Sequence, residues 1–338
     1  MERAPPRASG YRPDPPAADA RVRWPASFGQ RFTVMVDTEE EFDWSQPFSR
    51  DARATTAVGA IPAAAAWFAD RGVAATWLMD YPVATSPQAR EVFGEVLADA
   101  RSALGTQLHS WVNPPLAHDR RATDSYAGNL PADLHAAKLD TLTAAIEQGF
   151  GRRPVIHRAG RYGIGPDTLR LLAERGYRFD CSMRARYDYS AGGGPDFRAI
   201  GNAAFRCGPG GAIVELPFTT IFTGHARAWG PRLSGRLGRL TGPASRARLL
   251  SRISLTPEDM PLPDVLEAIR VAAGEGPALL NFSFHSPSLV PGHTPYVRDA
   301  RDLARFWAWW DAVLNALARA GIGPATLAEI DAATAPLA

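Results

Sequence analysis

The sequence predicts an α/β fold in which a parallel sheet, open or closed into a barrel, is covered by helices. Apolar runs of strand length alternate along the chain with longer stretches that have helical spacing, which is typical of βαβ units. Polar residues directly follow several of the apolar runs, and α/β proteins bind ligands at the carboxyl ends of parallel strands. The chain has 338 residues, 46% of them hydrophobic, which is enough for one barrel-sized domain or for two smaller ones.

The first predicted strand ends in a concentration of acidic side chains. Residues 31–44 have the sequence RFTVMVDTEEEFDW, in which an apolar run is followed by Asp37, Glu39, Glu40 and Glu41. The run predicts a buried strand, and its end supplies carboxylates to the ligand-binding edge of the sheet. We expect Asp37 and Glu39 to face that site, and Glu40 and Glu41 to face solvent or to hydrogen-bond to the following loop.

Further apolar runs predict the other strands of the sheet: 73–79, 104–108, 155–157, 177–179, 212–217 and 277–284. Apolar residues at helical spacing predict the connecting helices: 58–71, 88–101, 133–148, 166–175, 263–273 and 301–320. A short last strand is predicted at 326–330. The strands should bring these polar side chains to the same edge as Asp37: His109, Arg158, Asp180, Glu215 and His285.

Outside this α/β pattern, two regions have a biased composition. Residues 1–28 are rich in proline, alanine and arginine, which predicts a disordered tail before a single domain at 29–338. Residues 225–252, an insertion in that domain, contain seven arginines, and no acidic residue occurs from 216 to 257. Such a run is usually a solvated face or a flexible insertion, and contact of residues 227–252 with an anionic surface is the alternative.

The composition excludes several classes of protein. The net charge of +2 implies no nucleic acid or other strongly charged partner for the protein as a whole. Two cysteines make no disulfide framework, and no apolar stretch approaches the roughly 20 residues of a membrane span. We therefore expect a cytoplasmic protein with reduced thiols.

The side chains at the strand ends suit metal-assisted hydrolysis. A divalent ion takes histidine nitrogen and carboxylate oxygen as ligands and lowers the pKa of a bound water. A separate carboxylate can remove a proton from that water, and a second histidine can protonate the leaving group. His109 and His285, with Asp37 and Glu39 on the first strand, offer both kinds of group, although each residue alone is weak evidence.

Several stretches of the chain resemble the polysaccharide deacetylase (NodB-homology) superfamily, and more narrowly its WalW-type branch. They extend from about residue 32 to about residue 330 and include VDTEEEFDW (36–44), LHSWVNPP (108–115), GNLP (128–131), HRAGRYGIGP (157–166), FDCSM (179–183), GPDF (194–197) and SFHSPSLVPGHTPYV (283–297). The resemblance implies a single-domain distorted (β/α)7 barrel and a hydrolase that removes N- or O-acetyl groups from a carbohydrate. It also implies a zinc-like divalent ion, with manganese, cobalt and nickel as alternatives.

The resemblance assigns four residues to catalysis by their positions in the matching segments. Asp37 matches the general base, and Arg158 matches the arginine that orients this base. His285 matches the general acid, and Asp180 matches the acidic residue that supports this histidine.

For the metal, the resemblance implies Glu39 and His109 as ligands, with Asn113 in the place of a second histidine. The chain departs from the family pattern here, because Thr38 stands where a second adjacent acid is usual. An asparagine oxygen suits harder ions better than zinc. In addition, Pro114 disfavours the helical turn that would aim Asn113 back beside His109.

Four residues are expected to bind the substrate. Arg161 and Tyr162 match the positions that supply the backbone amide of an oxyanion hole, although Gly160-Arg161 stands where an Arg-x-Pro motif is expected. Trp44 offers an indole face on which a sugar ring can stack, with a structural role as the alternative. Glu215 completes the set from the end of its strand.

These observations lead to a metal-dependent deacetylase whose substrate is a cell-envelope glycan, its lipid-linked precursor or a smaller N-acyl sugar. The second hypothesis is a carbohydrate-binding or regulatory barrel whose metal site has decayed. The third is a glycosidase that uses Glu39 and Glu215 as its two carboxylates, and it leaves Arg158 and His285 without a role. We expect a carbohydrate partner, no membrane span and no nucleic acid.

Overall fold

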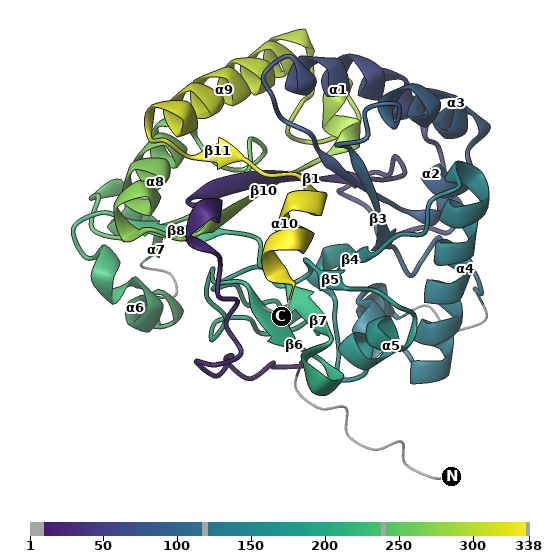
Figure 1. Ribbon diagram of the computed structural model, residues 1–338, viewed down its shortest axis with the longest axis horizontal. Helices are drawn as coiled ribbons and strands as arrows, with labels where there is room; N and C mark the ends of the chain where they lie inside the picture. The colour runs from purple at the N-terminus through teal and green to yellow at the C-terminus, as the bar shows by residue number, and fades with distance from the viewer. Residues whose placement is uncertain (1–9, 117–120, 238–240, 336–338) are drawn as a thin grey trace.

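The computed structural model describes residues 10–116, 121–237 and 241–335, and its centre is a curled sheet with helices outside (Figure 1). Within these residues, seven parallel strands follow the order β10-β1-β2-β3-β4-β5-β7. They are β1 (Arg31–Thr38), β2 (Thr76–Met79), β3 (Ala103–Leu108), β4 (Ile156–Ala159), β5 (Phe179–Asp180), β7 (Ile213–Glu215) and β10 (Leu279–His285). At the edge, β6 (Phe205–Cys207) pairs antiparallel with β7, and β11 (Gly323–Pro324) pairs parallel with the first residues of β1. The predicted distorted barrel is confirmed.

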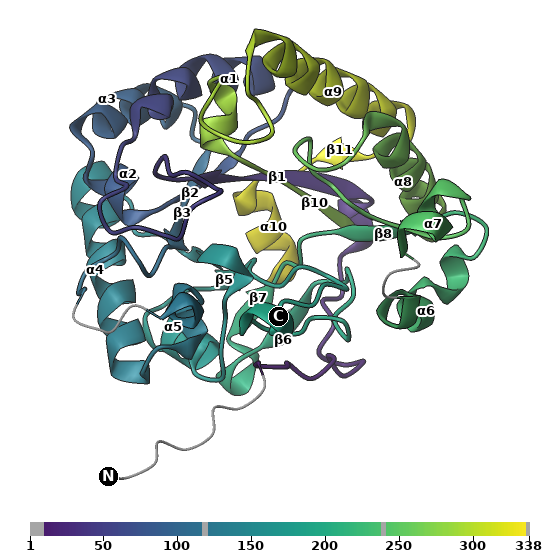
Figure 2. The same cartoon turned by 180° about the vertical axis from the view of Figure 1, so that it is seen from behind.

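Helices connect most of the successive parallel strands and cover the outer face of the sheet (Figures 1 and 2). They include α1 (Ile61–Ala69), α3 (Pro87–Val96), α4 (Ala132–Phe150), α5 (Thr168–Glu174), α8 (Leu262–Glu275) and α9 (Ala300–Arg319). Each of these overlaps a helix that the sequence predicts.

Two helices differ from the prediction because side chains cap them. The short helix α2 (Tyr81–Thr85) follows β2 directly, since the Asp80 carboxylate accepts a hydrogen bond from the Val83 amide at 2.8 Å. The strand predicted at 326–330 is wrong: this segment begins helix α10 (Leu327–Thr334). Thr326 and Glu329 form a capping box there, which satisfies the first backbone amides of a helix.

The alternation of side chains along β1 decides which of them reach the interior of the barrel. Phe32, Val34 and Val36 pack in the outer core between the sheet and the helices, whereas Met35 packs inside the barrel. Successive side chains of a strand point to opposite faces, so Asp37 has the same inward direction as Met35. The first strand therefore aims a carboxylate into the barrel at its carboxyl end.

The register of the neighbouring strand brings a histidine beside this carboxylate. In the parallel pairing of β1 with β10, Asp37 lies opposite His285, and Met35 lies opposite Ser283. Phe282 and Phe284 pack in the outer core, so Ser283 and His285 share the inward face. Two segments almost 250 residues apart therefore place an acid and a histidine side by side.

The opposite end of the barrel is closed by apolar side chains from the two ends of the described chain. Leu327 and Ile330 of α10 pack with strand residues inside the barrel, and α10 lies across the ring of strands on the near side in Figure 1. Val22 and Trp24 pack against the same cluster, and the Val22 amide donates to the Ala204 carbonyl at 2.9 Å. The predicted disorder is therefore wrong for residues 10–28, while residues 1–9 lie outside the described part.

The arginine-rich insertion lies between β8 (Thr220–Thr223) and β9 (Ser251–Ser254), an antiparallel pair in the gap between β7 and β10. It contains α6 (Gly230–Leu237) and α7 (Thr241–Arg246), and residues 238–240 lie outside the described part. Trp229 is 60% exposed in this section. Contact of residues 227–252 with an anionic surface stays a prediction. Among the described helices, none has the length and apolar character that crossing a membrane requires.

Candidate active site

A pocket of about 300 Å³ opens at the carboxyl ends of the parallel strands. Its wall includes eight of the residues predicted from the sequence: Asp37, Glu39, Trp44, His109, Arg158, Arg161, Tyr162 and His285. Three other predicted residues are not part of this wall: Asn113, Asp180 and Glu215. The predicted catalytic and metal-binding residues are thus mostly brought together, and the exceptions have definite structural causes.

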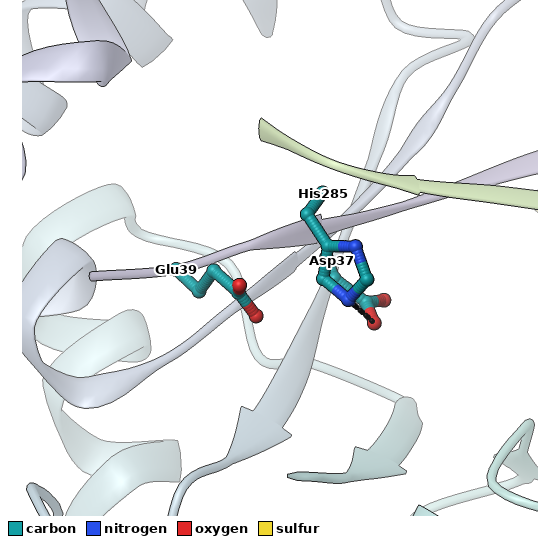
Figure 3. Close-up of side chains that lie close together, drawn as sticks. All are labelled: Asp37, Glu39 and His285. Carbon is teal, nitrogen blue, oxygen red and sulfur yellow. Dashed lines mark ion pairs between the residues drawn. The ribbon is translucent and has the colours of Figure 1, made fainter. Parts of the chain in front are cut away.

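Asp37 lies between a buried arginine and a histidine. Its Oδ1 accepts a hydrogen bond from Arg158 Nη1 at 2.5 Å, and its Oδ2 lies 3.6 Å from His285 Nε2, the dashed contact in Figure 3. Arg158 is 1% exposed and also donates to Ser283 Oγ at 2.6 Å. Burial favours the neutral guanidine, but the charge of Asp37 keeps the pKa of Arg158 above its ordinary value. The Asp37 carboxylate is therefore compensated and held in one orientation.

His285 is held by Glu258, a residue that the sequence did not single out. The Nδ1 atom of His285 lies 2.7 Å from Glu258 Oε2, and its backbone amide donates to Glu258 Oε1 at 3.0 Å. Ser288 Oγ donates to the same carboxylate at 2.6 Å. Burial alone would lower the pKa of His285, but the carboxylates of Glu258 and Glu39 outweigh it and raise the pKa to about 10. The imidazole is thus kept protonated at neutral pH, with Nε2 toward Asp37.

The expectation that Asp180 supports His285 is wrong, because Asp180 points to the other face of the sheet. Phe179 packs inside the barrel, so the next residue of β5 faces outward. There Asp180 lies opposite Glu215 in the pairing of β5 with β7 and accepts a hydrogen bond from Ser182 Oγ at 2.7 Å. Burial and the charge of Asp180 raise the pKa of Glu215.

Glu215 also points to the outer face of the sheet, so its predicted contact with the substrate is wrong. Its carboxylate is fully buried and accepts a hydrogen bond from the Met183 amide at 3.0 Å. A side chain in this position cannot contact a substrate in the pocket. It also cannot form a pair of glycosidase carboxylates with Glu39, which lies in the pocket wall.

His109 is oriented by Glu40, which the prediction placed in solvent or against the following loop. Glu40 is fully buried, and its Oε2 lies 2.7 Å from His109 Nδ1. Trp111 Nε1 donates to Glu40 Oε1 at 2.7 Å, and its ring stacks on the imidazole of His109 with centroids 4.2 Å apart. Burial raises the pKa of Glu40 to about 8. Because Nδ1 is held this way, Nε2 faces the pocket, 3.5 Å from Glu39 Oε2.

Glu40 is in turn held by Asp80 at the end of β2. The Glu40 amide donates to Asp80 Oδ2 at 2.8 Å, and burial together with the charge of Glu40 raises the pKa of Asp80. Glu41 differs from its neighbour, since it hydrogen-bonds to the following loop at the Ala57 amide, 2.6 Å away. The three adjacent glutamates thus have three different partners.

Asn113 is not part of the pocket wall, and its side-chain Oδ1 is a buried acceptor without a partner among the described residues, so its role as a ligand stays a prediction. The chain does make a turn after His109, with the Asn113 amide donating to the His109 carbonyl at 3.0 Å. The side-chain Nδ2, however, donates to the carbonyl oxygens of Pro114 and Lys138 at 2.7 and 3.0 Å. The buried ammonium of Lys138 bonds three carbonyls of this loop and holds it in place.

The pocket wall contains donor atoms that suit a divalent cation. Glu39 Oε1 and Gln107 Oε1 are buried acceptors without a hydrogen-bond partner among the described residues. Burial raises the pKa of Glu39 to about 7, which a bound cation would reverse. Asp37 and Glu39 each offer a carboxylate oxygen, and these lie within 4.8 Å of one another, whereas the protonated His285 beside them has no free lone pair for a cation (Figure 3). With His109 Nε2 nearby, these carboxylate and imidazole groups fit a zinc-like ion.

Gly160 leaves the space that the His109 ring occupies. A Cβ added there would lie 2.5 Å from His109 Cδ2 and 2.9 Å from the Leu108 carbonyl oxygen. We therefore expect Gly160→Ala to lower the free energy of unfolding by about 1–3 kcal/mol, the usual cost of overpacking, as measured by urea denaturation.

The matched control is Gly94→Ala, in α3, where an added Cβ has no atom within 4 Å. Alanine is the better helix former, so this variant should be at least as stable as the wild type. Equal stability of the two variants would contradict close packing between Gly160 and His109.

The segment after β4 is held in a backbone conformation that side chains rarely adopt. Arg161 and Tyr162 have φ values of 56° and 60°, in the left-handed region. This geometry places both side chains in the pocket wall, where strained residues are common at functional sites. Trp44 reaches the same wall and packs edge-on against His285, with centroids 5.0 Å apart.

Comparison with known proteins gives likeness in structure only. No family model and no curated protein matches the chain. The chain is similar to a protein from Mycobacterium smegmatis described as a candidate polysaccharide deacetylase, with 16% identity, a TM-score of 0.50, and coverage of 91% of this chain and 96% of that one. It is also similar to a family 4 carbohydrate esterase from Streptomyces lividans in complex with acetate, with 12% identity, a TM-score of 0.37, and coverage of 87% and 90%.

A CE4 family pseudoenzyme from Bacillus anthracis is a further similar structure, with 9% identity and a TM-score of 0.39. The alignment covers 88% of this chain and 64% of that one. Because the mycobacterial structure is only 16% identical in sequence, this likeness establishes the fold alone. This chain has a barrel of the polysaccharide deacetylase type.

Proposed function

We propose that the protein is a divalent-metal-dependent hydrolase that removes an acetyl group from an amino sugar or another acylated carbohydrate. One observation carries this proposal: Asp37 stands between Arg158 and His285 at the strand ends, beside donor atoms that suit a cation. Hydrolysis of an amide or ester needs a base, an acid and a group that stabilises the developing negative charge. The pocket has a candidate for each of these functions.

Asp37 is the proposed general base, and Arg158 is the residue that positions it. The ion pair between them holds one carboxylate oxygen, so Oδ2 remains available to take a proton from a water molecule. His285, protonated and oriented by Glu258, is the proposed general acid that donates a proton to the leaving nitrogen or oxygen. Because Glu258 contacts Nδ1, the proton at Nε2 is the one directed into the pocket.

Glu39 and His109 are the residues that would hold the cation, with Asp37 within reach. The ion would lower the pKa of a bound water and polarise the acyl carbonyl. Glu40 and Trp111 keep the His109 Nε2 directed toward Glu39. Such partners of a metal-binding histidine fix its tautomer and its ring orientation.

Aromatic side chains make most of the remaining pocket wall and suit a sugar ring. Trp44 presents its ring beside His285 and Tyr296, and a sugar can stack on such a face. The backbone amides of Arg161 and Tyr162 are the proposed oxyanion hole. A cell-envelope glycan or its precursor remains the proposed physiological substrate.

A barrel that binds carbohydrate without catalysis is the second candidate. It is favoured by Asn113, which stands where the family pattern implies a second histidine and whose Nδ2 is held by the Lys138 carbonyl. A barrel without catalysis, however, would not need the Asp37–Arg158 ion pair or the contact between Glu258 and His285.

Metal analysis of the purified protein tests the proposal first. We expect about one divalent ion per chain after incubation with zinc, manganese, cobalt or nickel, and we expect Glu39→Gln to lose it. The matched control is Glu41→Gln, since Glu41 contacts the loop amide of Ala57. Asn113→Ala tests the third predicted ligand: loss of the ion assigns Asn113 to the site, and retention removes it.

The same preparations are then assayed for acetate release from N-acetylated sugars. Acetate release by the metal-loaded wild type and its loss in Glu39→Gln would support the hydrolase. An ion-free protein, or an ion retained in Glu39→Gln, would overturn this metal site. If no sugar is hydrolysed although sugars bind, the second candidate replaces the first.

A further inference from the structure

Two arginine side chains in the pocket wall have no acidic partner. Arg161 Nη1 donates to Ser125 Oγ at 2.5 Å, and its guanidinium lies 4.0 Å from the centroid of the Tyr126 ring. Arg184 donates from Nε and Nη2 to Ser254 Oγ at 3.1 and 2.8 Å. For both guanidinium groups, the described part of the chain contains no carboxylate within 4.0 Å.

The other strongly charged groups of the pocket are compensated. Arg158 pairs with Asp37, and Glu258 pairs with His285. Asp259 also lies in the pocket wall and interacts electrostatically with Arg184, but within the described residues the two side chains form no ion pair at 4.0 Å or less. An uncompensated cation in a partly buried pocket is costly unless a ligand supplies the opposite charge.

A further arginine, Arg252, adds positive charge near Arg184. The guanidinium of Arg184 lies 3.8 Å from the centroid of the Tyr187 ring, and that of Arg252 lies at the same distance from this ring. Tyr162, Tyr189 and Arg184 line the pocket together. Aromatic faces stabilise these cations without neutralising them, so the planar donor groups remain suited to an anion.

We propose that the carbohydrate substrate carries an anionic group, a carboxylate or a phosphate, which Arg161 and Arg184 bind. The inference rests on the proposed function for the reaction, and it concerns which sugars the pocket accepts. Guanidinium groups match the oxygens of a carboxylate or a phosphate geometrically and form charge-assisted hydrogen bonds with them. The aromatic wall then contacts the sugar ring, and the anionic group sets the ring's position relative to Asp37.

Binding is measured first by calorimetry with the full-length, metal-loaded protein. The probes are neutral N-acetylglucosamine, N-acetylglucosamine 6-phosphate and N-acetylglucosaminuronic acid, which carries a carboxylate. We expect at least one charged sugar to bind about tenfold or more tightly than the neutral one, as one charge-assisted contact allows. The phosphate and carboxylate probes distinguish the two sources of charge.

Three variants test the two arginines. Arg161→Gln and Arg184→Gln should each remove most of the preference for the charged sugar, and Arg184→Lys should retain more of it than Arg184→Gln. The matched control is Arg186→Gln, because Arg186 bonds the Arg198 carbonyl outside the pocket wall. This control should keep the preference for the charged sugar, which would show that replacing a nearby arginine does not by itself disturb the pocket.

Acetate release from the same sugars separates this inference from the proposed function. Arginine-dependent preference in binding without release from any sugar would retain the inference and overturn the hydrolase. Release from neutral and charged sugars with equal kcat/KM and equal affinity would retain the hydrolase and overturn the inference. Binding of none of the sugars, or a preference unchanged in both glutamine variants, would also overturn it.

Discussion

Replacement of Asp37 by asparagine should lower kcat for acetate release by about 10²–10⁴-fold, the range expected for loss of a general base. The asparagine side chain has the same shape and can still accept a hydrogen bond from Arg158, but it cannot take a proton from water. Acetate release is measured at saturating substrate, in the presence of the divalent ion. The control is Asp43→Asn, which changes an exposed acid of the following loop that bonds Ser45.

Metal content distinguishes the two possible roles of Asp37. If Asp37 is only the base, Asp37→Asn should retain the ion. If Asp37 is a ligand, the variant should lose it. Carboxylate oxygens of Asp37 and Glu39 lie within 4.8 Å of one another, so both roles of Asp37 are geometrically open. Full activity in Asp37→Asn would contradict the base, and loss of the ion together with activity would make Asp37 a ligand.

Replacement of Arg158 by methionine should lower the free energy of unfolding by about 3–5 kcal/mol, the cost of leaving one member of a buried ion pair alone. Asp37 and Arg158 are 4% and 1% exposed, and their contact is 2.5 Å long. Urea denaturation at neutral pH measures this cost. Activity should fall as well, since Asp37 loses the hydrogen bond that holds its carboxylate in one orientation.

An exposed ion pair of the same length provides the control. Arg178 and Asp331 are also 2.5 Å apart, with side chains 52% and 32% exposed, so Arg178→Met should cost about 0–1 kcal/mol. In addition, Asp37→Asn combined with Arg158→Met should be more stable than Arg158→Met alone. A double variant no more stable than Arg158→Met would show that the cost comes from lost packing rather than from unpaired charge.

The fold was largely predictable because long elements carry a periodic signal. The alternation in Phe32, Val34 and Val36 predicts β1, and helices such as α4 and α9 have enough turns for their apolar spacing to be recognised. The last predicted strand failed because five residues carry little periodicity. The capping box of Thr326 and Glu329 stabilises a helix there instead.

The position of Asp180 could not be predicted from the sequence. Strand β5 has two residues, Phe179 and Asp180, which is too short to reveal which of them faces inward. The resemblance to a family assigned the acid that supports the late histidine to Asp180, by its position in a matching segment. In the folded chain this acid is Glu258, 27 residues before His285 and outside any strand.

The sequence by itself determined a parallel α/β fold and the set of strand-end residues Asp37, Glu39, His109, Arg158 and His285, because hydrophobic periodicity and strand ends are local properties of the chain. The closure of the sheet into a barrel was implied only by the family resemblance. Only the tertiary structure decided the partners of these residues: Glu258 for His285, Glu40 and Trp111 for His109, and the outward face for Asp180 and Glu215. Such pairings depend on strand register, side-chain direction and loop path, which arise only when distant segments pack together.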